Sequence, residues 1–256
     1  MAVYYNEIDG YAAQWLRNLA AAGHIPAGDV DERNIVDVQA SDLAGYDQCH
    51  FFAGIGGWAL ALRLAGWGNL ECWTGSCPCQ PLSGAGKRQG HTDERHLWPA
   101  FCRLISEFRP AIVFGEQVAS KDGCEWLAGI HADLEGFDYA FGAADLPAAS
   151  VGAPHQRQRL FWGAYMHSAQ PIGERDAGRS DQTAFERAVA QNFQIGDRRF
   201  AQLVAMDVAQ RADSYAQARR VVDGISGGVD RLRALGNAIV PQVAAEFVIA
   251  FMECGI

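Results

Sequence analysis

Short apolar runs alternate with amphipathic stretches along the first two-thirds of the chain. The apolar runs have the length and composition of buried strands, and we predict strands at residues 2–7, 49–54, 71–76, 111–116 and 159–165. The amphipathic stretches predict helices at residues 11–23, 58–66 and 97–110, which end at Gly23, Gly66 and Pro110. This alternation predicts an α/β fold with a doubly wound, mostly parallel sheet.

The pattern dissolves over residues 166–230, which are rich in Arg, Asp, Gln and Ala and contain basic and acidic residues in nearly equal numbers. Order returns over residues 231–252, with a turn at Gly236–Asn237 and an apolar helix after Pro241. We therefore expect one catalytic and cofactor-binding domain at residues 1–165, completed by residues 231–256. Residues 166–230 would form a small separate segment.

Composition excludes several classes of protein. No apolar run approaches the roughly 20 residues that span a bilayer, and the first residues lack the basic and apolar regions of a signal peptide. Seven cysteines without a CxxC pair favour a reducing compartment over a disulfide framework, so we expect a cytoplasmic protein. The net charge is −9, so a nucleic acid would have to meet a local basic surface.

The stretch "HFFAGIGG" places Gly54, Gly56 and Gly57 between a predicted strand and a predicted helix. Small residues there let a ligand approach the backbone, and a helix N-terminus offers free N–H groups. A dinucleotide fingerprint would need glycine where Ala59 stands, so an adenosyl ligand is favoured over a pyrophosphate one. A plain tight turn is the alternative.

Two cysteines flank one proline in "GSCPCQPLSGAGKR". Together with His91 and His96, Cys77 and Cys79 come near a zinc-finger spacing, but structural zinc sites separate their cysteines by two to four residues. A Cys-x-Cys redox pair is a second interpretation, without other support in the chain.

A third interpretation is a single reactive thiolate. Such a group needs positive charge nearby, and Lys87 and Arg88 follow a few residues on. Gly84 and Gly86 would let that loop fold over a substrate. From these residues alone, a buried structural cysteine is an equal alternative.

Five motifs together resemble the cytosine-5 DNA methyltransferases. They are "HFFAGIGG", "GSCPCQPLSGAGKR", "FGEQV", "PHQRQRLF" and "RALGNAIVPQVA". The resemblance implies a Rossmann-like methyltransferase fold, S-adenosyl-L-methionine as cofactor and a DNA (cytosine-5)-methyltransferase activity. It also implies that residues 166–230 are a small target-recognition segment.

The order of the motifs is rearranged. "YYNEIDGYAAQWLRNL" is similar to the family's second motif and "AGDVDERNI" to its third, yet both precede the glycine motif. We therefore expect the strand ending near Glu7 to lie beside the strand ending near Phe52, with the strand ending near Asp29 beyond it. We also expect a right-handed crossover from the glycine-motif strand to the cysteine strand.

Four positions depart from the family's pattern. His50, Cys77, Gln117 and His155 stand where the family has Asp, Pro, Asn and Gln. The nucleophilic cysteine, the glutamate and both arginines of the motifs are retained. We expect these four departures to affect the fine geometry of the site and the rate of the reaction.

The resemblance assigns catalytic roles to Cys79, Glu116, Arg157 and Arg159. A Cys79 thiolate would add to carbon 6 of cytosine, which makes carbon 5 able to accept a methyl group. Glu116 would hydrogen-bond ring nitrogen 3 and the exocyclic amine. Arg157 and Arg159 are predicted to alternate on a strand, to point to one face and to bind the base carbonyl and a phosphate. Cys77 would only pack.

Two further sets of residues follow from the motifs. The residues expected to bind the cofactor are Glu7, Ile8, Asp29, Phe52, Gly54, Gly56 and Asn237. The residues expected to bind the substrate are Gln80, Ser83, Lys87 and Arg88. Within the first set, Ile8 and Phe52 would sandwich the adenine, Glu7 would take the two ribose hydroxyls and Asp29 would accept from the adenine amine.

The expected partner is double-stranded DNA, from which the target cytosine is flipped, rather than RNA. We expect a monomer that needs no metal or membrane and is encoded by a prokaryote or phage. Restriction-modification, phage self-protection and regulation are the roles that the sequence leaves open. The alternatives are an RNA cytosine-5 methyltransferase, an enzyme with a different one-carbon donor, and an inactive nucleic-acid-binding relative.

Overall fold

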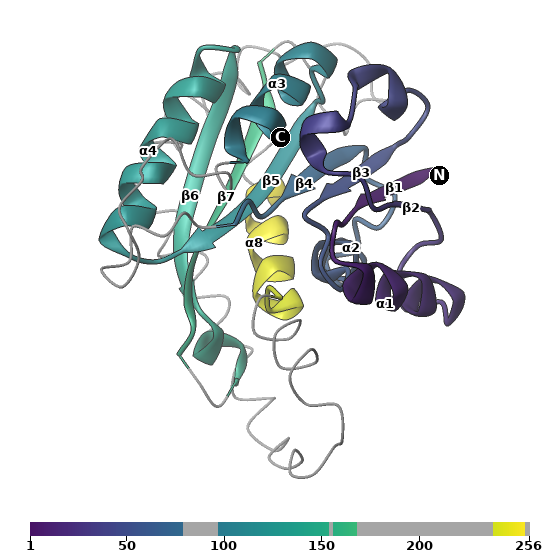
Figure 1. The fold of residues 1–256 in the computed structure, drawn as a ribbon. Coiled ribbons are helices and arrows are strands. Elements are labelled where there is room, and N and C mark those ends of the chain that lie inside the picture. Colours follow the sequence, from purple (N-terminus) through teal and green to yellow (C-terminus); the bar gives the residue numbers. More distant parts are fainter. Residues whose placement is uncertain (79–96, 154–155, 168–237, 254–256) are drawn as a thin grey trace, which may run out of the picture.

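The computed structural model describes residues 1–78, 97–153, 156–167 and 238–253 (Figure 1). The strands in these residues are β1 (Val3–Asn6), β2 (Asp29–Asp31), β3 (Gln48–Phe51), β4 (Cys72–Gly75), β5 (Ile112–Val118), β6 (Tyr139–Pro147) and β7 (Gln158–Met166). The helices are α1 (Gly10–Ala21), α2 (Gly57–Leu64), α3 (Trp98–Phe108), α4 (Lys121–Glu135) and α8 (Pro241–Glu253), with 3₁₀ turns η1 (Ile35–Asp37), η2 (Ala40–Leu43) and η4 (Ala148–Val151).

The strands form one seven-stranded sheet in the order β2-β1-β3-β4-β5-β7-β6. Neighbouring strands from β2 to β5 pair in parallel, and β7 runs antiparallel to both β5 and β6. Because helices cover both faces, the prediction of a doubly wound, mostly parallel α/β fold is confirmed. No helix of the described residues is both long and apolar enough to cross a membrane.

The two faces of the sheet are covered by different helices. α1, α2 and α8 pack on the face that carries Tyr5 of β1 and Phe114 of β5. α3, α4 and the 3₁₀ turns η1 and η2 pack on the opposite face, against Phe51 of β3 and Trp73 of β4. Burying an aromatic side chain of this size stabilises a fold by about 1.5–3 kcal/mol, so these two layers supply most of the apolar stabilisation.

The helix ends follow local chemistry. The Asp9 carboxylate accepts hydrogen bonds from the backbone N–H groups of Tyr11 and Ala12 and so caps the start of α1. Ser120 caps α4 in the same way through the N–H of Gly123. Gly23, in the left-handed region with φ 71°, follows α1 where the sequence predicted its end.

The N-terminal unit lies where the rearranged motif order predicted. β1 pairs with β3, with Asn6 opposite Phe51, and β2 lies on the other side of β1, with Asp31 opposite Asn6. The strand that ends just before Glu7 is therefore the neighbour of the strand that ends just before Phe52. This part of the prediction is confirmed.

The hand of one crossover is not as predicted. α2 and α3 lie on opposite faces, yet both carry the chain one strand in the same direction, from β3 to β4 and from β4 to β5. The two connections therefore have opposite hands. The β1–α1–β2 connection has the same hand as β4–α3–β5. The chain moves across the sheet in the opposite direction, from β1 to β2, and α1 lies on the face opposite to α3.

Nearly all parallel connections, about 98%, are right-handed, so β3–α2–β4 is the left-handed exception and the predicted right-handed crossover is wrong. The reason lies in the motif order. α2 stays on the face of α1, where the glycine turn meets Glu7, but the next strand in the sequence is β4, on the side of β3 away from β1.

Candidate active site at the carboxyl edge of the sheet

Glu7 is the first residue after β1, and it joins the ends of three strands. Its backbone N–H donates to the carbonyl of Asp31 at the end of β2, over 3.0 Å. Its carboxylate accepts from the backbone N–H of Gly54, after β3, over 2.7 Å and from that of Asp9 over 2.9 Å. The acid that the sequence analysis assigned to a ribose is thereby fixed at the glycine turn.

The glycine turn itself combines open space with tight packing. Phe52 and Gly54 both adopt positive φ angles, 51° and 55°, and a Cβ added to Gly54 would meet nothing within 4 Å. The outer side of Gly54 is thus open to a ligand. Gly56 has φ 78°, and a Cβ there would lie 2.9 Å from the Ile25 side chain, so its lack of a side chain serves packing against the N-terminal unit.

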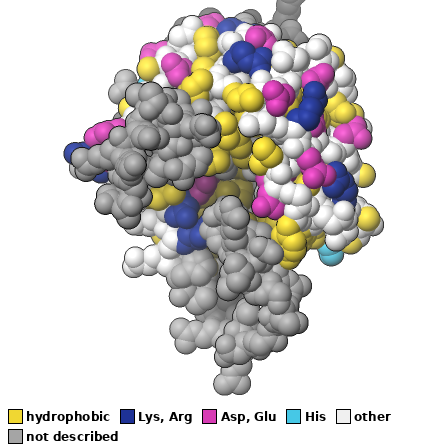
Figure 2. Space-filling model, in the orientation of Figure 1, with side chains coloured by type: hydrophobic (Ala, Val, Ile, Leu, Met, Phe, Trp, Pro, Cys, Tyr) yellow, Lys and Arg dark blue, Asp and Glu magenta, His cyan; other side chains and the backbone are white. Residues whose placement is uncertain are grey.

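Two apolar residues stand next in sequence to these groups: Ile8 follows Glu7, and Phe52 precedes the glycine turn. Ile8 is 63% exposed although it is a large aliphatic residue, and Phe52 is partly buried with its ring edge-on to Phe101. Figure 2 shows hydrophobic side chains gathered near the middle of the visible face, with charged side chains close by. An apolar wall beside a carboxylate and an open glycine fits a nucleoside, which has a flat apolar base and a sugar with hydroxyls.

Asp29 does not belong to this group. It begins β2 rather than following it, and it pairs with Tyr4, three residues before Glu7. Its carboxylate accepts from the Tyr46 hydroxyl over 2.6 Å. The predicted strand near Asp29 lies beyond β1 as expected, but it ends at Asp31, two residues later, and the structure does not bring the Asp29 side chain to the carboxyl edge.

His50 lies one residue before the end of β3, under the glycine turn. It is 1% exposed, its Nδ1 is 2.8 Å from the Thr74 hydroxyl, and its ring stacks on Tyr5. Burial lowers the pKa of His50 to about 3, so the imidazole is neutral at physiological pH. Where the family has a carboxylate, this chain has an uncharged ring.

Strand β4 leads directly into the cysteine segment. Ser76 accepts a hydrogen bond from the Trp58 indole over 3.0 Å, and Cys77 is buried in the cluster that includes Phe101. Burial raises the pKa of the Cys77 thiol well above its usual value, which disfavours the nucleophilic thiolate. The prediction that Cys77 only packs agrees with this position. Cys79 lies outside the described residues.

Glu116 and Arg159 form the most buried ion pair of the described residues. The Arg159 Nε lies 2.7 Å from a Glu116 carboxylate oxygen, and the two side chains are 21% and 10% exposed. Burial raises the pKa of Glu116, against the opposing charges of Arg159 and Arg157. The three predicted catalytic charges are thus brought together. Glu116 is on β5, which adjoins β4 and its cysteine segment, and Arg159 is on β7, the next strand of the sheet.

Arg157 departs from its predicted place on the strand. β7 begins at Gln158, and Arg157 precedes it with φ 34°, so the two arginines do not alternate on one strand. The Arg157 guanidinium donates to the carbonyl of Ala238 over 2.7 Å. This contact brings the C-terminal segment to the site, where Ile239 also packs over Gly57.

Several predicted residues lie outside the described residues, and their roles stay predictions. They are Cys79, Gln80, Ser83, Lys87, Arg88 and Asn237, together with His91 and His96 of the zinc alternative. Among the described residues no cluster of three His, Cys, Asp or Glu could hold a metal ion.

Asn6 lies at the candidate site although no sequence motif indicated it. Asn6 is 3% exposed at the end of β1, and its carbonyl accepts from the N–H of Ala53 in the glycine turn. Its side-chain amide donates to the carbonyl of Arg33 over 2.8 Å and to that of Asp31 over 3.3 Å. The sequence contained a signal for Asn6, because a polar residue at the end of a buried strand needs hydrogen-bond partners.

A mostly parallel α/β sheet with an acid, a glycine turn and a buried Glu–Arg pair at its carboxyl edge defines a class of nucleoside-cofactor enzymes. The family model of the C-5 cytosine-specific DNA methylases matches residues 68–197, just over half of the 256 residues. The chain belongs to this family.

Curated proteins that resemble the chain are named type II methyltransferases. The type II methyltransferase M.HhaI of Haemophilus parahaemolyticus is 26% identical over 170 residues, which cover 50% of this chain and 51% of that protein. M.AplI of Arthrospira platensis is 34% identical over 93 residues, 36% of this chain and 27% of the relative. The chain thus spans between about a quarter and a half of the length of these relatives. The S. pombe Dnmt2 methyltransferase structure covers 98% of each chain at 13% identity and a TM-score of 0.49.

Proposed function

We propose that the chain is a DNA (cytosine-5)-methyltransferase that uses S-adenosyl-L-methionine. The observation that carries the proposal is the buried Glu116–Arg159 pair, one strand away from the segment Cys77-Pro78-Cys79 in a member of the cytosine-5 family. The cofactor would supply an electrophilic methyl group. Glu7, Ile8, Phe52, Gly54 and the backbone around Gly56 are the described residues that would hold it.

The protein's own residues would act on the flipped cytosine. Cys79 would add to carbon 6, which places electron density on carbon 5. Glu116 would hydrogen-bond ring nitrogen 3 and the exocyclic amine, and its raised pKa favours a shared proton at that position. Arg159 would hold the Glu116 carboxylate and the base carbonyl, while Arg157 ties the C-terminal segment to the same place.

The remaining assignments belong to the same proposal. Lys87 and Arg88 would contact phosphates, Gln80 and Ser83 the base, and Asn237 the cofactor. Residues 166–230 would recognise the target in duplex DNA, and residues 1–165 with 231–256 would form the catalytic domain. The protein would act as a monomer in the cytoplasm of a prokaryotic or phage-infected cell, within a restriction-modification system.

A nucleoside assay tests the proposal without knowledge of the target sequence. Unmethylated genomic DNA is incubated with the protein and S-adenosylmethionine, digested to nucleosides and analysed by mass spectrometry, with Cys79→Ser as the control. We expect 5-methyldeoxycytidine with the wild type and none with the variant. Modification of RNA alone, a different added mass, or no product in either nucleic acid would contradict the proposal.

A further inference from the structure

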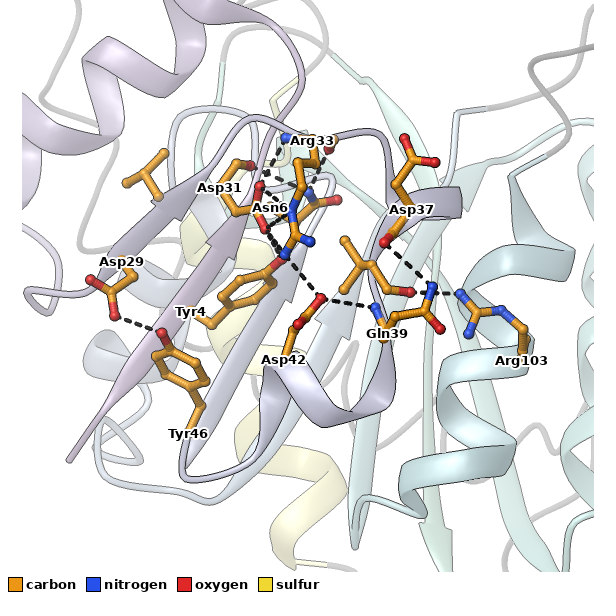
Figure 3. A network of polar contacts seen from close by, with 12 residues as sticks. Tyr4, Asn6, Asp29, Asp31, Arg33, Asp37, Gln39, Asp42, Tyr46 and Arg103 are labelled. Carbon is orange, nitrogen blue, oxygen red and sulfur yellow. Dashed lines mark hydrogen bonds and ion pairs between the residues drawn. The ribbon is translucent and has the colours of Figure 1, made fainter.

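A polar network occupies the end of β2, next to the proposed cofactor site (Figure 3). We call it the Arg33 network. Its members are Tyr4, Asn6, Asp31, Arg33, Gln39 and Asp42. The proposed reaction uses none of their side chains, yet the network is the most densely connected polar group of the described residues.

Arg33 is the centre of the network. Its Nε lies 2.9 and 3.1 Å from the two Asp31 carboxylate oxygens, its Nη2 lies 2.7 Å from one of them, and its own N–H donates to Asp31 as well. The Tyr4 hydroxyl donates to the same carboxylate over 2.7 Å. Burial opposes ionisation of Asp31, but the hydrogen bonds from Arg33 outweigh it and lower its pKa. Asp31 is therefore held as a charged anchor.

The network reaches into the connection from β2 to β3. The Arg33 guanidinium also lies 3.0 Å from the Asp42 carboxylate, which in turn accepts from the N–H of Gln39 over 3.1 Å. In the same connection, the carbonyl of Val38 accepts from Arg103 of α3 over 2.7 Å. The turns η1 and η2 are short 3₁₀ helices, so no α-helix stiffens this connection. The hydrogen bonds and the ion pair hold it in place instead.

Asn6 links this network to the cofactor site. Its amide donates to the carbonyls of Asp31 and Arg33, while the carbonyl of Asp31 also accepts from the backbone N–H of Glu7. The position of the Glu7 main chain thus depends on the turn after β2, and Arg33 closes that turn. A displacement of this turn would move the Glu7 carboxylate relative to Gly54.

The charges in the Arg33 network give a second reason to expect that Arg33 affects the Glu7 site. The carboxylates of Asp31 and Asp42 share one guanidinium. The hydrogen bonds from the Gln39 N–H and from Arg33 keep the pKa of Asp42 below its usual value, while the charge of Asp31 opposes this. Without Arg33 they would repel each other beside Glu7. Isolated exposed ion pairs contribute little to stability, and Arg33 is 48% exposed, so its importance lies in geometry rather than in folding free energy.

We propose that Arg33 is a positioning residue for the nucleoside end of the cofactor site, acting through Asp31 and Asn6 on Glu7. The inference rests on the proposed function, because it concerns the affinity for S-adenosyl compounds. It predicts a selective loss of cofactor affinity, with the chemical step intact.

The test compares Arg33→Ala, Arg33→Lys and the control Arg17→Ala. Arg17 makes an ion pair of the same length, 2.7 Å, with Glu32 at the same strand end, and it has a similar exposure, but it does not contact Asp31, Asp42 or Asn6. Calorimetry with S-adenosylhomocysteine gives the affinity, thermal unfolding the stability, and turnover at saturating cofactor the chemical step.

We expect Arg33→Ala to weaken S-adenosylhomocysteine binding by roughly 2- to 30-fold, with turnover at saturating cofactor nearly unchanged. Arg33→Lys should recover part of the affinity, because it keeps the charge without the bidentate geometry. Arg17→Ala should bind like the wild type.

Equal affinities for wild type and Arg33→Ala would overturn the inference alone. So would a loss that Arg17→Ala shares, or one in which turnover and melting temperature fall together. A wild type that binds no S-adenosylhomocysteine would instead overturn the proposed function, and the inference with it.

Discussion

The Glu7 carboxylate lies 2.7 Å from the backbone nitrogen of Gly54, 47 residues further along the chain. This contact joins the predicted second motif to the predicted first motif across two adjacent parallel strands, β1 and β3. It fixes the N-terminal segment against the glycine turn of the candidate site.

Replacing Glu7 by Ala should weaken S-adenosylmethionine binding by about 1.5–3 kcal/mol, the range for hydrogen bonds to a charged group. The rate at saturating cofactor should change much less, because the carboxylate is expected to contact the ribose and not the base. Calorimetry and steady-state kinetics check this, with the exposed Glu32→Ala as control. Unchanged affinity in Glu7→Ala would show that the N-terminal match to the family is accidental.

Replacing Glu116 by Gln should cut turnover by roughly 10²- to 10⁴-fold, the range for general acid–base groups, and leave cofactor binding nearly intact. The amide cannot share a proton with the base in the same way, and it loses the ion pair with Arg159. Single-turnover assays measure the effect. Glu125→Gln, which alters an exposed pair with Lys121, is the control, and normal turnover in Glu116→Gln would refute the assignment.

The two cysteines should behave differently. Cys79→Ser should abolish methyl transfer, whereas Cys77→Ala should retain measurable activity, because the Cys77 thiol is buried and protonated. A duplex containing 5-fluorocytosine at the target should form a denaturation-resistant adduct with the wild type and with Cys77→Ala only. Equal loss in both variants, with zinc in the purified protein, would support the metal interpretation instead.

His50 should make the fold sensitive to mild acid. Its pKa of about 3 in the folded protein lies below the ordinary value of 6.5, so the unfolded chain binds the extra proton and stability falls as pH drops below 6.5. Between pH 7.5 and 5.5 this costs about 1.4 kcal/mol. Urea unfolding of His50→Asn should show a pH dependence smaller by that amount. Identical dependence in both proteins would mean that the ring binds its proton as readily in the folded protein as in the unfolded chain. Other titrating groups, Glu116 among them, are common to both and cancel in the comparison.

The sequence predicted most of the elements that position the site. The strands before Glu7, Phe52 and Ser76 lie where the apolar runs placed them, because each run is buried on both faces and therefore reads as strand without ambiguity. The helix α4 was not predicted, since Gly123 and Gly129 interrupt its pattern. The strand β6 is rich in Ala and Gly, which carry little strand signal.

The errors in the site have a common physical origin. Asp29 and Arg157 were placed from motif spacing alone, but the exact residue at which a strand begins depends on tertiary contacts. Tyr46 takes the Asp29 carboxylate, and the turn at η4 ends the pairing of β7 at Gln158. The hand of the β3–α2–β4 connection was likewise hidden, because a sequence pattern does not state which face of a sheet a helix covers.

The transposed order leaves one half of the site in a continuous N-terminal piece. Glu7, Ile8 and the Arg33 network all precede the exposed Gly45, and the glycine turn, Cys79, Glu116 and Arg159 all follow it. A gene divided at Gly45 would therefore yield two polypeptides, one with Glu7 and Ile8 of the proposed cofactor site and one with the glycine turn and the proposed chemistry. Only their reassembly through the β1–β3 pairing would restore the Glu7–Gly54 contact, so the chain has the layout of a natural two-fragment complementation system.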